Sequence, residues 1–167
     1  MRRSALLTAL AACTFAANAF AAECRQERAI YGDRDGAYEL VFEPVGSEAA
    51  VATHRFKVRA VKGDLVLDGN IMMADEVARS IGMIMHACPE GDVTGEELAA
   101  CTVWQGVIYP IDKAGVLSEL VPAEGNDAAD RLLIAGFGPA LRFSRAWEEA
   151  KLATAPWDEL TFKECAK

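Results

Sequence analysis

Histidine is scarce in this chain of 167 residues, which contains only His54 and His86. Zinc sites and general-base sites commonly use histidine, and neither of these two residues lies in a known catalytic or metal-binding motif. No two cysteines have the C-x-x-C spacing, and His86 with Cys88 is the only close pair of the two residue types. We therefore expect no metal site, no cofactor and no catalytic residue.

Long apolar runs are also scarce, and the one at the N-terminus has the features of an export signal. Residues 1–3 carry two positive charges, residues 4–15 are largely apolar, and residues 19–21 form a small-x-small cleavage site. The apolar segment is too short to span a membrane, and no later run approaches the roughly 18 apolar residues of a membrane helix. The sequence predicts a signal peptide over residues 1–21 and one mature domain over residues 22–167, located in the periplasm or secreted.

A second interpretation of the N-terminus is a lipid anchor. The sequence Leu10-Ala11-Ala12-Cys13 resembles the lipobox of bacterial lipoproteins, in which the cysteine is acylated. The apolar segment before Cys13 is unusually short, and a good cleavage site without a cysteine follows it. We favour cleavage after Ala21 and keep lipidation of Cys13 as the alternative.

Basic residues are outnumbered throughout the mature chain. All 25 acidic residues lie in it with 15 of the 17 basic ones, since Arg2 and Arg3 leave with the signal peptide, and its net charge is therefore −10. An acidic domain does not attract phosphate backbones, so nucleic acid is not an expected partner.

Four cysteines remain after removal of the signal peptide. An even number in an exported chain predicts two disulfides, and four cysteines allow three pairings. We favour Cys88–Cys101, which are close in sequence, with Cys24–Cys165, which would join the two ends of the mature chain. The first bond would close a loop of about 14 residues and contribute roughly 3 kcal/mol in the chain-entropy model.

The segment between Cys88 and Pro110 is the most informative stretch. Thr94 and Glu97 have capping-box spacing, which predicts a short helix over residues 95–101. Residues 102–109 are rich in β-branched and aromatic residues and apolar on both faces, as in a buried strand that ends at Pro110.

Four exposed positions are candidates for contact with a partner. Asp92, Glu96 and Glu97 lie in the expected disulfide loop, which could present them to a partner. In the alternative interpretation the disulfide only stabilises the fold, and the three charged side chains are simply solvated. Trp157 is either an interface residue or a cover over one end of the fold.

A row of basic residues follows the strand expected from residue 54. Arg55, Lys57 and Arg59 share one face, which would suit either an anionic partner or cross-strand pairing with Glu39 and Glu43. We favour the pairing.

The element pattern predicts an α+β fold, a single domain with a mostly antiparallel sheet, two late helices and disulfide staples. Residues 68–70 are expected to form a turn or bulge, and residues 75–79 could form a helical turn. The late helices are expected over residues 127–135, with Asn126 as N-cap, and over residues 139–152, with Phe143 facing inward. Strands are expected over residues 29–45 (a hairpin), 54–62, 65–67, 80–87, 102–109, 116–121 and 160–165.

We find no resemblance to a known family in these residues. The expectation is an exported bacterial envelope protein that acts as a non-catalytic binding or accessory module, is monomeric and has an envelope protein as its partner. One alternative is a carboxylate-dependent hydrolase of envelope polymer, which needs two facing carboxyl groups in a cleft, with Asp64, Asp68, Glu96 and Glu97 as candidates. Another is a small-ligand binder, which needs an apolar pocket near Trp104 and Met83.

Overall fold

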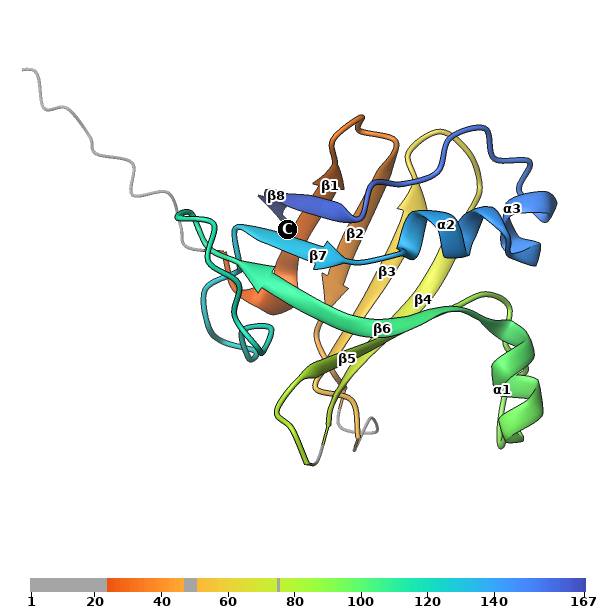
Figure 1. Ribbon diagram of the computed structural model, residues 1–167, viewed down its shortest axis with the longest axis horizontal. Coiled ribbons are helices and arrows are strands. Elements are labelled where there is room, and N and C mark those ends of the chain that lie inside the picture. The colour runs from red at the N-terminus through yellow and green to blue at the C-terminus, as the bar shows by residue number, and fades with distance from the viewer. Residues whose placement is uncertain (1–23, 47–50, 75) are drawn as a thin grey trace, which may run out of the picture.

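Eight strands form a closed antiparallel barrel in which each strand pairs with the next and β8 pairs with β1 (Figure 1). The computed structural model describes residues 24–46, 51–74 and 76–167, so the expected signal peptide and Cys13 lie outside the described residues. The strands are β1 (Ala29–Asp33), β2 (Tyr38–Glu43), β3 (His54–Ala60), β4 (Val66–Met73), β5 (Ser80–Met85), β6 (Thr102–Ile111), β7 (Arg131–Ile134) and β8 (Glu159–Cys165). The helices are the 3-10 turn η1 (Gln26–Arg28) and the short α1 (Gly95–Cys101), α2 (Phe137–Arg142) and α3 (Arg145–Glu149).

The expected α+β class is wrong, because the described chain is mostly β and its sheet closes on itself. The helix expected over residues 127–135 is instead a loop followed by β7, with Leu132 and Ile134 facing the interior. A short apolar run fits the helical and the strand period equally well, and here β7 supplies the hydrogen bonds that join β6 to β8. The helix expected over residues 139–152 is two separate short helices, α2 and α3.

Two expectations for residues 65–79 are also wrong. The turn expected at residues 68–70 lies inside β4, which runs without interruption against β3 and β5. Gly69 is required there because a Cβ atom would lie 2.1 Å from the ring of Phe56. The described part of residues 75–79 contains no helical turn.

Side chains alternate along the strands, and the inward ones fill the barrel. On β3, for example, Phe56 and Val58 are buried while Arg55 and Arg59 are exposed. The largest fully buried strand side chains are Tyr31, Leu40, Phe42, Phe56, Leu67, Ile71, Ile84, Ile108, Leu132 and Ile134.

The basic row on β3 pairs with carboxylates on both neighbouring strands. Arg59 lies opposite Glu39 in the β2–β3 register, with 2.6 Å between the guanidinium Nη2 and the carboxylate. Lys57 lies 2.7 Å from Asp68 of β4. The expected cross-strand pairing is therefore confirmed for Glu39, whereas Glu43 lies opposite Arg55 without an ion pair among the described residues.

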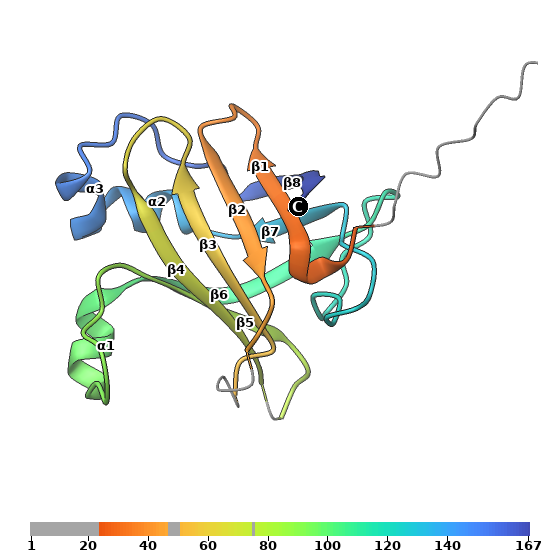
Figure 2. The same ribbon diagram turned by 180° about the vertical axis from the view of Figure 1, so that it is seen from behind.

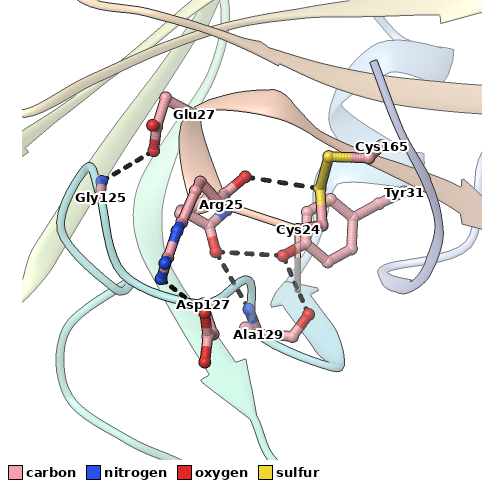
Figure 3. The surroundings of a disulfide bond; sticks show 9 residues. Cys24, Arg25, Glu27, Tyr31, Gly125, Asp127, Ala129 and Cys165 are labelled. Atoms are coloured by element: carbon pink, nitrogen blue, oxygen red, sulfur yellow. Dashed lines mark hydrogen bonds and ion pairs between the residues drawn. A yellow bond between two sulfur atoms is a disulfide. The ribbon is translucent and has the colours of Figure 1, made fainter. Parts of the chain in front are cut away.

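Both expected disulfides form, and the structure joins Cys24 to Cys165 and Cys88 to Cys101. The first bond links the residues before η1 to the end of β8 (Figure 3). Beside it, the buried hydroxyl of Tyr31 donates a hydrogen bond at 3.0 Å to the carbonyl of Ala129. The two ends of the described chain are thus fixed to each other and to the loop before β7.

Alternate connections of an antiparallel barrel lie at the same end, which divides the loops into two groups. The connection β5–β6, which contains α1, shares one end with the connection β7–β8, which contains α2 and α3 (Figures 1 and 2). The tight β1–β2 and β3–β4 turns lie at this end too. We call it the helical end.

Candidate functional site

The helix α1 is held in place by local interactions and by a disulfide. The Thr94 hydroxyl accepts from the N–H of Glu97 at 3.2 Å, and the Glu97 carboxylate accepts from the N–H of Thr94 at 2.9 Å. The expected capping box is therefore confirmed. No residue of α1 is buried, and Cys88–Cys101 ties its last residue to the chain leaving β5. The helix α1 is therefore largely exposed along its length and is attached covalently to the chain after β5 by the Cys88–Cys101 disulfide.

The helices α2 and α3 are anchored more deeply at the same end. Phe137, Leu141 and Trp147 are buried in the core cluster. The carboxylate of Asp158 accepts from the N–H of Gly136 at 2.7 Å, where φ is 77° and glycine is favoured. These contacts anchor α2 and α3 to the barrel.

A groove of about 410 Å³ lies between α1 and the α2–α3 segment. One side is formed by α1, and the other by α3 with its junction to α2. The segment that follows β5 and the start of β6 contribute the rest. The lining residues are His86, Ala87, Pro89, Glu97, Ala100, Cys101, Thr102, Val103, Phe143, Ser144, Arg145, Ala146 and Glu149.

Phe143 is the most exposed aromatic side chain on this groove, with 88 % of its surface accessible. It follows α2 directly, and Ser144 then caps α3 by accepting from the N–H of Trp147. In a continuous helix Phe143 and Trp147 would share one face. The break at Ser144 buries Trp147 and leaves Phe143 in solvent, so the expected inward position of Phe143 is wrong.

Three charged or titratable side chains form a network along the groove. The Nε2 atom of His86 lies 3.1 Å from one carboxylate oxygen of Glu149, and Arg145 donates to the other oxygen at 3.1 Å. Since a carboxylate only accepts, Nε2 of His86 carries the hydrogen. The bonds from His86 and then Arg145 lower the pKa of Glu149.

The two carboxylates that line the groove both have lowered pKa values. The hydrogen bonds from Thr94 lower the pKa of Glu97, and Glu149 is lowered as well. A glycosidase needs one carboxyl whose pKa is raised so that it can donate a proton. The two hydroxyl groups that line the groove are also engaged in hydrogen bonds, because Thr102 donates to the carbonyl of Leu98 and Ser144 donates to the carbonyl of Leu141.

Of the four carboxyl groups that the sequence offered for hydrolysis, Glu97 lines this groove and the other three do not. Asp64 and Asp68 belong to the β3–β4 region, and Asp68 is paired with Lys57. Glu96 is exposed on α1 and does not line the groove. The chain from Cys24 onward, apart from residues 47–50 and 75, contains no group of three acidic, histidine or cysteine residues suited to a metal ion.

The pocket needed for a small ligand near Trp104 and Met83 is not formed by these residues. Trp104 is buried in the barrel and donates to the carbonyl of Ala135 at 3.0 Å. Met83 lies opposite Gln105 on β6, one residue out of register with Trp104, and faces outward. The two side chains therefore lie on opposite faces of the sheet.

The structure brings together only part of the predicted partner-binding set. Asp92, Glu96 and Glu97 are all exposed on or beside α1, and Glu97 lines the groove. Trp157 lies elsewhere, beside the β1–β2 turn, where its indole N–H donates to Asp35 at 2.8 Å.

Trp157 is also covered on one face. The guanidinium of Arg34 lies 4.1 Å from the ring centroid, and the residue is 44 % exposed. These contacts favour the interpretation that Trp157 covers this end of the fold over the interpretation that it is an interface residue.

Sequence reasoning missed Phe143, His86, Arg145 and Glu149 as groove residues. The signal for Phe143 was present in Ser144, because serine is a strong N-cap and marks a new helix start inside an expected helix. The pairing of His86 with Glu149 joins positions 63 residues apart, and no local pattern announces it.

Comparisons with protein-family models, with curated proteins and with solved structures find no match to this chain. No helix in residues 24–46, 51–74 and 76–167 has the length and apolar character needed to cross a membrane.

Proposed function

We propose that this protein is a non-catalytic binding module of the bacterial envelope that holds a partner protein at its helical end. Export is supported by the N-terminal signal pattern and by two disulfides, which persist in oxidising compartments. The single observation that carries the binding role is Phe143, an aromatic side chain 88 % exposed on the rim of a groove. Exposed aromatic residues beside concave surfaces are typical anchors of protein interfaces.

The surroundings of Phe143 support a binding site more than a reaction site. Its neighbours in the groove are small apolar residues and side chains already engaged in hydrogen bonds. Both carboxylates of the groove are held in the ionised form, which suits charge recognition rather than proton donation. The groove is also bounded by a disulfide, which reduces the entropy lost when a partner orders this surface.

Capture from the native envelope tests this proposal. The tagged mature protein, with both disulfides intact, is incubated with periplasmic and membrane extracts of the source bacterium, and bound proteins are identified by mass spectrometry. The wild-type protein should retain one stoichiometric partner, and Phe143→Ser should lose most of it.

The matched control is Val116→Ser, which changes an apolar residue that is 59 % exposed in the β6–β7 connection, at the other end of the barrel. This variant should retain the partner. Equal retention by Phe143→Ser and the wild-type protein, or no partner with any variant, would contradict the proposal and raise the hydrolase alternative again.

A further inference from the structure

One of the two segments that enclose the groove is strongly acidic, and the other has no net charge. Residues 86–101 contain four carboxylates and no lysine or arginine, and residues 142–149 contain two carboxylates and two arginines. Arg145 is paired with Glu149, and the guanidinium of Arg142 is stacked over the ring of Trp147 at 4.7 Å. An anionic ligand would therefore meet a surface on which negative charge dominates.

We infer that the groove receives a lysine or arginine side chain of the partner, with its cationic head between Glu97 and Glu149. This inference rests on the proposed binding function and names the chemistry that the groove would recognise. Charge complementarity of this kind steers association and selects among partners.

The two carboxylates reach the groove from different elements. Glu97 comes from α1 and Glu149 from α3, and both line the same hollow. The hydrogen bonds that Glu97 makes within the described chain all go to its Oε2 atom, so its Oε1 atom is open to a new donor. Glu149 accepts one bond at each oxygen, and a carboxylate oxygen can accept a second.

The remainder of the lining suits the aliphatic part of such a side chain. The small or apolar residues of the same lining are Ala87, Pro89, Ala100, Val103 and Ala146. Lysine and arginine pack their methylene stems along apolar surface while the head stays with charged groups. The ring of Phe143, also in the lining, offers a second favourable surface to a cation.

Titration of the oxidised, exported protein with defined peptides tests this inference, using backbone amide chemical shifts as the readout. The probe is acetyl-Leu-Lys-Leu-amide. Two matched peptides replace its lysine with norleucine, which removes the charge but keeps the stem, or with glutamate. The lysine peptide should shift the amides of Ala100, Thr102 and Arg145, and should bind at least about fivefold more tightly than the norleucine peptide.

Variants of the protein assign the charge effect to the two carboxylates. Glu97→Gln and Glu149→Gln should each weaken binding of the lysine peptide by about twofold to fivefold and leave the norleucine peptide unaffected. Glu164→Gln, at an exposed position on β8 away from the groove, should leave binding of both peptides unchanged.

The outcomes separate this inference from the proposed function. Equal binding of the lysine and norleucine peptides at the groove, or no shift of the groove amides with the lysine peptide, would overturn the cation inference. The proposed function would still stand if the envelope partner continued to depend on Phe143. Loss of that dependence would remove the proposed function even if the lysine peptide bound.

Discussion

The imidazole of His86 and the carboxylate of Glu149 lie 3.1 Å apart and connect the last residues of the β5 region to the end of α3. His86 also donates its backbone N–H to the carbonyl of Cys101, the residue that ends α1. One histidine thus contacts both helical sides of the groove, so the shape of the groove depends on the disulfide loop and on the α2–α3 segment together.

The two disulfides should differ in what they stabilise. Replacing Cys88 and Cys101 with serine should remove roughly 3 kcal/mol in the chain-entropy model and release α1, which buries no residue of its own. The near-ultraviolet circular dichroism of the buried aromatic core should remain, and the backbone amides of residues 95–101 should exchange rapidly with solvent.

The matched experiment replaces Cys24 and Cys165, which are 141 residues apart and close a far longer loop. The loss of unfolding free energy should then be larger, on the order of 4–5 kcal/mol, and should affect the whole barrel. A larger loss from the Cys88–Cys101 pair in urea unfolding would contradict this assignment.

His54 should make the barrel less stable in mild acid. It is 3 % exposed, its Nε2 lies 2.8 Å from the carbonyl of Pro122, and burial lowers its pKa below the usual histidine value of about 6.5. The unfolded chain therefore binds the proton more readily. This contribution to stability is complete above about pH 6.5 and is lost as the pH falls toward the lower folded-state pKa.

The measurement is the free energy of unfolding in urea at pH 7.5 and pH 5. The wild-type protein should lose more stability over this interval than His54→Gln, which cannot titrate. The prediction fails if the two proteins lose the same amount.

Gly69 should be intolerant of even one methyl group. A Cβ atom there would overlap the Phe56 ring at 2.1 Å, and overpacking of this kind costs about 1–3 kcal/mol. The control is Gly46→Ala, because a Cβ at Gly46 meets no atom within 4 Å. Thermal denaturation of both variants measures the difference, and adding Phe56→Leu should recover part of the loss in Gly69→Ala.

Ser144 should contribute to stability as the cap of α3. Its hydroxyl accepts from the N–H of Trp147, and removal of such a cap by Ser144→Ala costs about 1 kcal/mol. Ser144→Asp keeps a capping acceptor and should restore most of the stability. If Ser144→Ala and Ser144→Asp unfold at the same urea concentration, the capping role is wrong.

Sequence patterns predict the features that depend on interactions between residues close together in the chain or on neighbouring strands. The capping box at Thr94, the alternation on β3 and the pairing of Arg59 with Glu39 all follow from residue spacing and charge. The choice of disulfides follows from sequence distance and from the position of the chain ends.

Closure of the barrel depends on long-range pairing and is not visible in any short window. Asp127 and Asp130 resemble a helix start, yet Arg131–Ile134 forms a strand because β6 and β8 both require a partner there. The groove is missed for a related reason, since its residues come from the β5–α1 connection, α1, β6 and the α2–α3 segment. Only Ser144 offered a local signal that Phe143 leaves the core.

The most direct test of the proposed binding role is photo-crosslinking in living cells of the source organism. A photoreactive phenylalanine analogue replaces Phe143 in one strain and Val116 in another, so the two ends of the barrel are compared in the same compartment. We expect irradiation to give one discrete crosslinked product from position 143 and none from position 116. No product from position 143, or the same product from both positions, would contradict a partner site at the helical end.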